Sequence, residues 1–198
     1  MAPLGQLAQV VSGESFSASQ TTDSPTALSR PVLGIKNLGD DGGIDLNDVT
    51  HVEGLERDGL FTLDEYSLVV IRTNGNEDRI GNVYRPRDSE VGFALSAFTF
   101  GCGFHDVSQR DLAFEYMRGR RFQQWATSLV AGSTGLKNLP IRNLRTASIP
   151  VASGPSAEAL EELGDVRQLE ASLRRHAQRT HVLTQAIRER VLAGERHV

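Results

Sequence analysis

The alternation of hydrophobic and polar positions predicts short strands over the first half of the chain. Tyr66–Thr73 (YSLVVIRT) groups branched apolar residues between polar flanks and is the strongest candidate for a buried strand. Asn74–Asn76 then turns the chain, and Arg79–Arg85 is expected to return as the hairpin partner. Leu4–Gly13 predicts a short strand or a helical turn closed by glycine, and Pro31–Leu38 predicts a further strand.

Two polar stretches between these elements predict loops. Glu14–Ser29 is rich in Ser and Thr and lacks periodicity, and Gly39–Asp48 (GDDGGIDLND) combines glycines with carboxylates. An EF-hand calcium loop needs oxygen ligands at positions 1, 3 and 5 and glycine at position 6. No frame across Asn37–Asp48 supplies them, so the acidic cluster is interpreted as a solvated turn.

The middle of the chain changes from strand-like to helical patterning. Val91–Phe104 is strand-like, with four aromatic residues expected in the core: Phe93, Phe98, Phe100 and Phe104. Asp106–Val130 predicts helix, with Asp106 or Ser108 as its N-cap and a break into two helices at Gly119. The densest basic cluster lies here and suits phosphate contacts, or equally a solvated helix face: Arg118, Arg120 and Arg121.

The last part of the chain has the pattern of a long charged helix. A linker over residues 151–155 precedes a helix expected over residues 156–194, whose apolar positions follow a 3,4 spacing typical of a coiled coil. Such a polar helix is poorly stable alone, so it needs a second copy, its own domain or another subunit as partner. The seam positions are Val166, Leu169, Leu173, His176, Thr180, Leu183, Ile187 and Arg190.

The segment Ala131–Pro150 separates the body from this helix. A turn-prone run over residues 132–135 precedes Leu139, Ile141 and Leu144, which alternate with polar residues until Ile149-Pro150. This pattern resembles the "GS…L…L…IP" closure of a target recognition domain in specificity subunits of type I restriction-modification systems. Leu4–Gly13 similarly resembles the opening of these domains. A glycine turn before an ordinary short strand is the alternative interpretation.

This resemblance implies both a fold and a function. The fold would be α+β: a mixed β-sheet target recognition domain with packed helices over residues 1–150, followed by a long C-terminal coiled-coil-type helix that serves as spacer. The function would be sequence-specific recognition of double-stranded DNA by a non-catalytic subunit that positions a partner methyltransferase or nuclease. In the family the modification subunit methylates adenine, so S-adenosylmethionine is expected in a partner and no cofactor in this chain.

A full specificity subunit of the resembled family carries two recognition domains and two antiparallel helices. The resemblance therefore implies that this chain corresponds to half of one. A homodimer through the C-terminal helix is expected, and its two-fold axis would present the recognition surfaces to a bipartite, palindromic site.

The distribution of charge locates the expected DNA contacts. The net charge is −4, yet residues 1–66 carry −8, residues 67–145 carry +4 and residues 146–198 are neutral. Only two of the 21 basic residues are lysines, and arginine suits phosphates and guanine, although a GC-rich genome also favours arginine. An ordinary polar hairpin tip would look similar to a DNA-binding one. The candidate contacts are Lys36, Asn37, Arg72, Asn74, Asn76, Arg79, Ser133, Thr134, Lys137 and Asn138.

Motifs for chemistry are missing from the sequence. There is no Walker A motif, no G-x-S-x-G, no H-E-x-x-H, no N-P-P-Y-type motif and no D/E-x-K, and FGCG departs from the F-x-G-x-G loop that binds S-adenosylmethionine. A single cysteine excludes an internal disulfide and a multi-cysteine zinc site. Cys102 with His105 or His51 could form a thiol and base pair, but a cysteine among phenylalanines is usually a small core residue.

Two further functions stay open. The chain could be a DNA-binding member of a phage-defence complex that recruits an effector other than a methyltransferase. It could also be a non-catalytic interaction or assembly module of such a complex, with little DNA specificity of its own. No apolar run approaches the roughly 18 residues of a membrane span, and the start lacks a basic n-region and an h-region, so a cytoplasmic protein without membrane contact is expected.

Overall fold

The computed structural model describes residues 1–22, 24–55, 60–132, 135–152, 172–173, 176 and 179–190. The chain divides into two compact units, Met1–Ser153 and Gly154–Val198. The first unit combines two four-stranded sheets with helices and is α+β, as predicted. In the second unit residues 179–190 are helical.

A central antiparallel sheet organises the first unit, with strand order β2-β10-β6-β8. Its strands are β2 (Ala8–Ser12), β6 (Ser67–Ile71), β8 (Val83–Tyr84) and β10 (Thr99–Phe104). All five residues of β6 are buried, because Leu68 and Val70 face one hydrophobic core while Val69 and Ile71 face another. The continuous apolar run of β6 is thus explained by burial on both faces, and its predicted hairpin pairing with β8 is confirmed.

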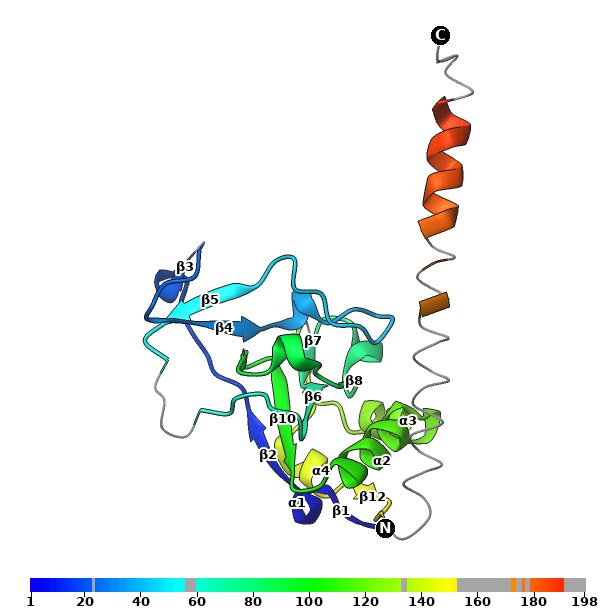
Figure 1. The fold of residues 1–198 in the computed structure, drawn as a ribbon. Helices are drawn as coiled ribbons and strands as arrows, with labels where there is room; N and C mark the ends of the chain where they lie inside the picture. The colour runs from blue at the N-terminus through cyan, green and yellow to red at the C-terminus, as the bar shows by residue number, and fades with distance from the viewer. Residues whose placement is uncertain are drawn as a thin grey trace. The chain divides into compact units, whose positions relative to one another are not determined.

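Helices cover one face of the central sheet (Figure 1). They are α1 (Leu4–Leu7), α2 (Val107–Arg118), α3 (Arg120–Ser128) and α4 (Ile141–Arg145). The predicted cap and break are confirmed: the Asp106 carboxylate accepts from the Gln109 N–H at 2.8 Å, and Gly119 separates α2 from α3. Phe100 of β10 and Met117 of α2 are fully buried in this core.

A second, mixed sheet lies on the other face of the central sheet, with order β3-β5-β4-β9 (Figure 1). Its strands are β3 (Thr21–Thr22), β4 (Ser29–Leu33), β5 (Thr50–Glu53) and β9 (Ala94–Leu95), and only the β4–β9 pair is parallel. On this side the glycines of β10 make room for an aromatic ring, since a Cβ at Gly101 would lie 2.3 Å from Cε1 of Phe61. The FGCG fragment is therefore strand backbone beneath Phe61.

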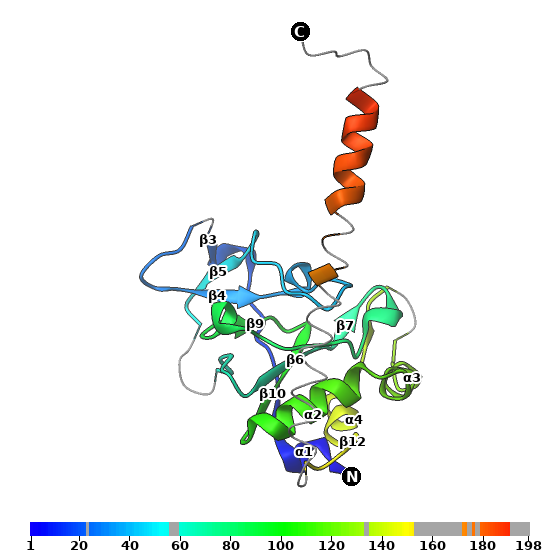
Figure 2. The same cartoon turned by 45° about the vertical axis from the view of Figure 1, so that its right-hand side comes forward.

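The first and last strands of the unit pair with each other. β1 (Ala2–Pro3) runs antiparallel to β12 (Ser148–Ile149), and α1 and α4 lie side by side at the same end (Figure 2). The buried Gln109 amide donates to the Pro150 carbonyl and accepts from the Ala152 N–H, both at 2.8 Å. The exit of the chain from this unit is thereby fixed beside its entry.

Three details of the strand assignment were wrong. The loop expected at Glu14–Ser29 contains a 3₁₀ turn, Ala18–Gln20, and β3, because the two threonines pair with β5. The strand expected at Pro31–Leu38 ends at Leu33 and gives way to a 3₁₀ turn, Ile35–Asn37. Phe98, expected in the core, is 45% exposed, because it lies in the turn between β9 and β10.

Parts of the predicted C-terminal helix lie outside the described residues. These parts include the seam positions Val166 and Leu169, the predicted helix start at residue 156 and linker residues 153–155. The continuous coiled-coil-type helix over residues 156–194 therefore stays a prediction. Within the described residues, no helix combines the length and the hydropathy that a membrane crossing requires.

Candidate nucleic-acid interface

Two segments expected to contact DNA are neighbours in the fold. β7 (Thr73–Asn74) pairs antiparallel with β11 (Lys137–Asn138), which places Asn74 opposite Lys137 and Thr73 opposite Asn138. The turn after β6 and the segment before α4 therefore form one edge, which we call the β7–β11 edge. Ser133 and Thr134, also expected to contact DNA, lie outside the described residues.

Arg72 and Asn138 hold this edge together. The Asn138 side-chain oxygen accepts from Arg72 Nε at 3.0 Å and from the Thr73 hydroxyl at 3.1 Å. Arg72 also donates to the Ala97 carbonyl at 3.3 Å, and its guanidinium lies 5.6 Å from the centre of the Phe100 ring. Both side chains are half-buried, so their polar groups already have partners within the fold.

The turn beyond β7 is shaped by its own side chains. Asn74 Oδ1 accepts from the Asn76 N–H at 2.9 Å, and Asn76 Oδ1 accepts from the Asp78 N–H at 3.0 Å. Within the described part of the chain, the side-chain amino groups of these two asparagines make no hydrogen bond. Lys137 forms an ion pair with Glu77, which reduces its availability for a phosphate.

Arg79 connects the same turn to the acidic loop at residues 38–48. Its guanidinium donates to the Leu38 carbonyl and pairs with the Asp40 carboxylate at 2.8 Å. The neighbouring Tyr84 hydroxyl donates to the Gly39 carbonyl at 3.0 Å, and burial raises the pKa of this phenol above its ordinary value. Arg79 and Tyr84 thus anchor the loop against the central sheet.

The two remaining candidates, Lys36 and Asn37, lie at the start of that loop. The Asn37 amide is buried, donating to the carbonyls of Asp45 (2.9 Å) and Asp48 (3.0 Å) and accepting from the Gly34 N–H (3.0 Å). Lys36 is exposed and pairs with Asp48 at 2.8 Å. Asn37 therefore organises the loop, and its buried amide makes its hydrogen bonds within the fold.

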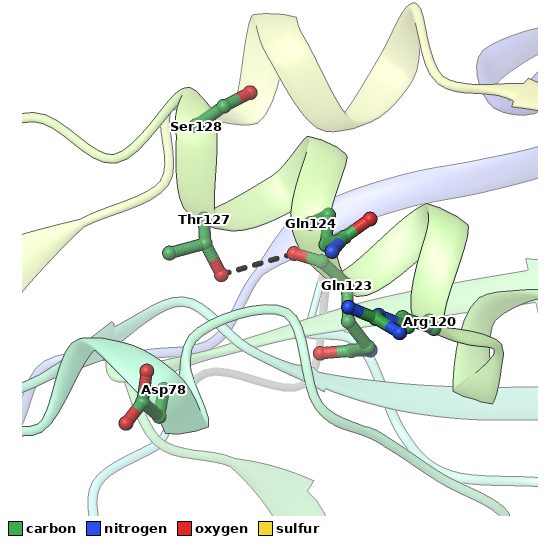
Figure 3. A pocket seen from close by; sticks show the side chains of 6 residues that line it. All are labelled: Asp78, Arg120, Gln123, Gln124, Thr127 and Ser128. Atoms are coloured by element: carbon green, nitrogen blue, oxygen red, sulfur yellow. Dashed lines mark hydrogen bonds between the residues drawn. The ribbon is translucent and has the colours of Figure 1, made fainter.

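A groove between α3 and the turn at Glu77–Arg79 was not predicted from the sequence. It has a volume of about 510 Å³ and is open to solvent (Figure 3). Asp78 forms one wall of the groove (Figure 3). The opposite wall consists of five residues of α3: Arg120, Gln123, Gln124, Thr127 and Ser128. Positions 120, 124, 127 and 128 share one helical face, a polar periodicity in RRFQQWATS that could have indicated the site.

The groove residues differ in whether the fold already uses their polar atoms. Gln123 is fixed, because its amide donates to the carbonyls of Gly81 (3.0 Å) and Met117 (2.7 Å). By contrast, within the described residues the side chains of Arg120, Gln124 and Asp78 make no hydrogen bond or ion pair. These three groups are exposed and available to a ligand.

The chemistry considered for Cys102 finds no support in its surroundings. The side chain is fully buried in β10, and burial raises the pKa of the thiol to about 12. A thiolate nucleophile is therefore disfavoured at neutral pH. Among the described residues, no cluster of three or more His, Cys, Asp or Glu side chains has the arrangement of a metal site.

The described seam positions of the second unit are exposed. Leu173, Leu183 and Ile187 have exposed fractions of 61%, 62% and 62%. The polar seam residues His176 and Thr180 are linked by a bond from the Thr180 hydroxyl to the His176 carbonyl at 2.9 Å. This contact spans four positions and satisfies the hydroxyl within its own helix.

Comparison with known proteins identifies solved structures that share the fold of this chain. No protein-family model and no curated protein matches the sequence. The S subunit of the type I restriction-modification system from M. genitalium matches with 14% identity and a TM-score of 0.60, over 98% of this chain and 45% of that chain. The HsdS subunit from Thermoanaerobacter tengcongensis matches with 12% identity and a TM-score of 0.61, over 96% of this chain and 43% of that chain.

A third match comes from a structure concerned with complex assembly and conformational transition of the type I R-M system. Its identity is 12% and its TM-score 0.67, over 97% of this chain and 44% of that chain. The resemblance found in the sequence is therefore confirmed at the level of fold, which is that of the target recognition domain of a specificity subunit. The chain spans less than half the length of these solved proteins.

Proposed function

We propose that Met1–Ser153 is a target recognition domain that binds double-stranded DNA sequence-specifically, within a specificity subunit of a restriction-modification or related phage-defence complex. The observation that carries the proposal is the fold shared with three type I restriction-modification structures over at least 96% of this chain. The subunit itself would be non-catalytic. A modification subunit that uses S-adenosylmethionine, or another effector of the complex, would perform the chemistry.

The β7–β11 edge supplies suitable groups for this role. The amino groups of Asn74 and Asn76 can donate to acceptors on base edges, and Lys137 can exchange Glu77 for a phosphate. The edge lies in the part of the chain that carries positive net charge, residues 67–145. Arg72 and Asn138 would hold the edge in place from behind.

Selection of sites from a random duplex pool by the full chain tests this function. A recognition domain should enrich one sequence, bind it more tightly than random duplex, and lose affinity steeply as salt is raised. Absence of binding to any duplex, even at low salt, would overturn the proposal. That result would favour the alternative, a non-catalytic assembly module with little DNA specificity.

We also propose that the C-terminal helix pairs two copies of the chain. The exposed apolar side chains Leu173, Leu183 and Ile187 support this pairing, because they follow the seam spacing. Light scattering on the full chain should give a dimer, and the double variant Leu183→Glu with Ile187→Glu should give a monomer. Gln185→Glu, off the seam, is the matched control and should remain dimeric. A monomeric unsubstituted chain would overturn the pairing.

A further inference from the structure

We propose that the groove between α3 and the turn at Glu77–Arg79 reads base edges, with Arg120 and Gln124 on one wall and Asp78 on the other. This inference rests on the proposed function and deepens it, because it identifies which side chains set sequence preference. None of the three was singled out for base reading from the sequence.

The groove has a rigid wall. Phe122 and Ala126 of α3 are buried in the helix-covered core, and the Phe122 and Trp125 rings lie 5.3 Å apart. Gly81 approaches α3 closely, since a Cβ there would lie 2.7 Å from the Ala126 Cβ. The Gln123 amide then ties α3 to the Gly81 carbonyl. Side chains on so firmly held a helix keep a defined position, as base discrimination requires.

The exposed side chains on the two walls of the groove have the chemistry of base recognition. An arginine guanidinium matches the two acceptors of guanine in the major groove, and a glutamine amide matches the donor and acceptor of adenine. A carboxylate accepts from the amino group of cytosine. All three types are present at Arg120, Gln124 and Asp78 (Figure 3).

The carboxylate of Asp78 also makes the groove more suitable for base edges than for phosphates. Asp78 makes no ion pair among the described residues, and its negative charge lies across the groove from the positive charge of Arg120, so the two side chains together give the groove no net formal charge. A phosphate entering there would be repelled by Asp78. A base edge carries no formal charge and offers an amino group for the carboxylate, so the groove favours base edges.

Availability distinguishes these residues from the basic candidates of the acidic loop and the β7–β11 edge. Lys36, Arg79 and Lys137 are engaged in ion pairs, and Arg72 is bonded to Asn138. Arg120 and Gln124 need not break such contacts before they bind a base edge, so their binding carries a smaller free-energy penalty. The groove also adjoins the β7–β11 edge, because Asp78 and Asn76 belong to one turn.

The test compares single variants of the full chain in site selection and in binding to the selected duplex. Arg120→Gln and Gln124→Ala should each weaken binding to the selected site about 10- to 100-fold while random duplex is bound as before. Each should also relax preference at one or two positions of the site. Arg121→Gln is the matched control, because Arg121 is exposed on the same helix but does not line the groove.

The outcomes separate this inference from the proposed function. If the unsubstituted chain selects a site and both groove variants keep its affinity and sequence preference, the groove inference fails and the proposed function stands. Equal losses on selected and random duplex would mean a phosphate contact and would likewise overturn base reading. If the unsubstituted chain selects no sequence, both the function and the inference fail.

Discussion

Several polar side chains near the acidic loop and the β7–β11 edge differ from two exposed side chains of α3, Arg120 and Gln124, in what they are bonded to. Asn37, Arg72 and Arg79 each make at least two contacts inside the fold. Arg120 and Gln124 make none within the described residues. Residue type therefore indicates which chemistry a side chain can perform, while the fold determines whether that chemistry is still available. Substitutions that measure stability can test this difference.

The largest effect is expected for Asn37→Ala. The substitution removes a buried amide and leaves the Gly34 N–H and the carbonyls of Asp45 and Asp48 without partners. Urea denaturation should show the free energy of unfolding lowered by about 3 kcal/mol. Asn47→Ala in the same loop is the control, since Asn47 is exposed, and it should change stability by less than about 0.5 kcal/mol. Equal effects would contradict the buried network.

A smaller effect is expected for Arg72→Met. The variant loses the bonds to Asn138 and Ala97 but keeps an apolar stem against Phe100, so unfolding should require about 2 kcal/mol less. A double-mutant cycle with Asn138→Ala isolates the pair and should give a coupling of about 0.5–2 kcal/mol. Strict additivity would show that the two side chains do not hold the edge together.

Arg79→Ala is expected to have a still smaller effect. Its ion-pair partner Asp40 is highly exposed, so solvent screens the pair, and the bond to the Leu38 carbonyl accounts for most of the loss. The expected decrease in unfolding free energy is about 1 kcal/mol. Hydrogen exchange should show faster opening in the acidic loop and unchanged protection in β6. Uniformly faster exchange would contradict a local anchoring role.

The smallest effect on stability is expected on α3. Gln124→Ala and Arg120→Gln remove exposed side chains without partners among the described residues. The free energy of unfolding, measured by thermal denaturation, should therefore change by less than about 0.5 kcal/mol. Gln123→Ala, one residue away, should cost about 1 kcal/mol or more, because the Gly81 and Met117 carbonyls lose a donor. A larger loss for Gln124 than for Gln123 would reverse the comparison.

Much of the fold was accessible from the sequence because local signals were strong. The apolar run of β6, the cap at Asp106 and the break at Gly119 are short-range features, and each was confirmed. The exposure of Phe98 to solvent could not be predicted, because it depends on the turn between β9 and β10. β3 was missed because its two threonines become a strand only by pairing with β5, a contact between distant segments.

The candidate site was predicted less completely, for the same physical reason. The sequence placed Asn74 and Lys137 among the candidates, and the structure makes them strand partners. It did not indicate that Asn37 would be buried, since burial of a loop amide depends on carbonyls 8 and 11 positions further along the chain. The groove beside α3 was missed because its two walls come from segments that only the fold brings together.

The pairing of β1 with β12 has a consequence for how this segment of the gene could be exchanged. Ala2, in the first strand of this unit, pairs with Ile149 in the last strand, and the Gln109 amide forms hydrogen bonds with the backbone of the residues that follow. A segment whose ends are adjacent can be excised and replaced as a cassette, because the flanking sequences meet the same geometry whatever lies between them. Recombination at these two points would exchange the whole segment between them for another in a single step. Circular permutation that joins the two ends should, by the same geometry, preserve the fold.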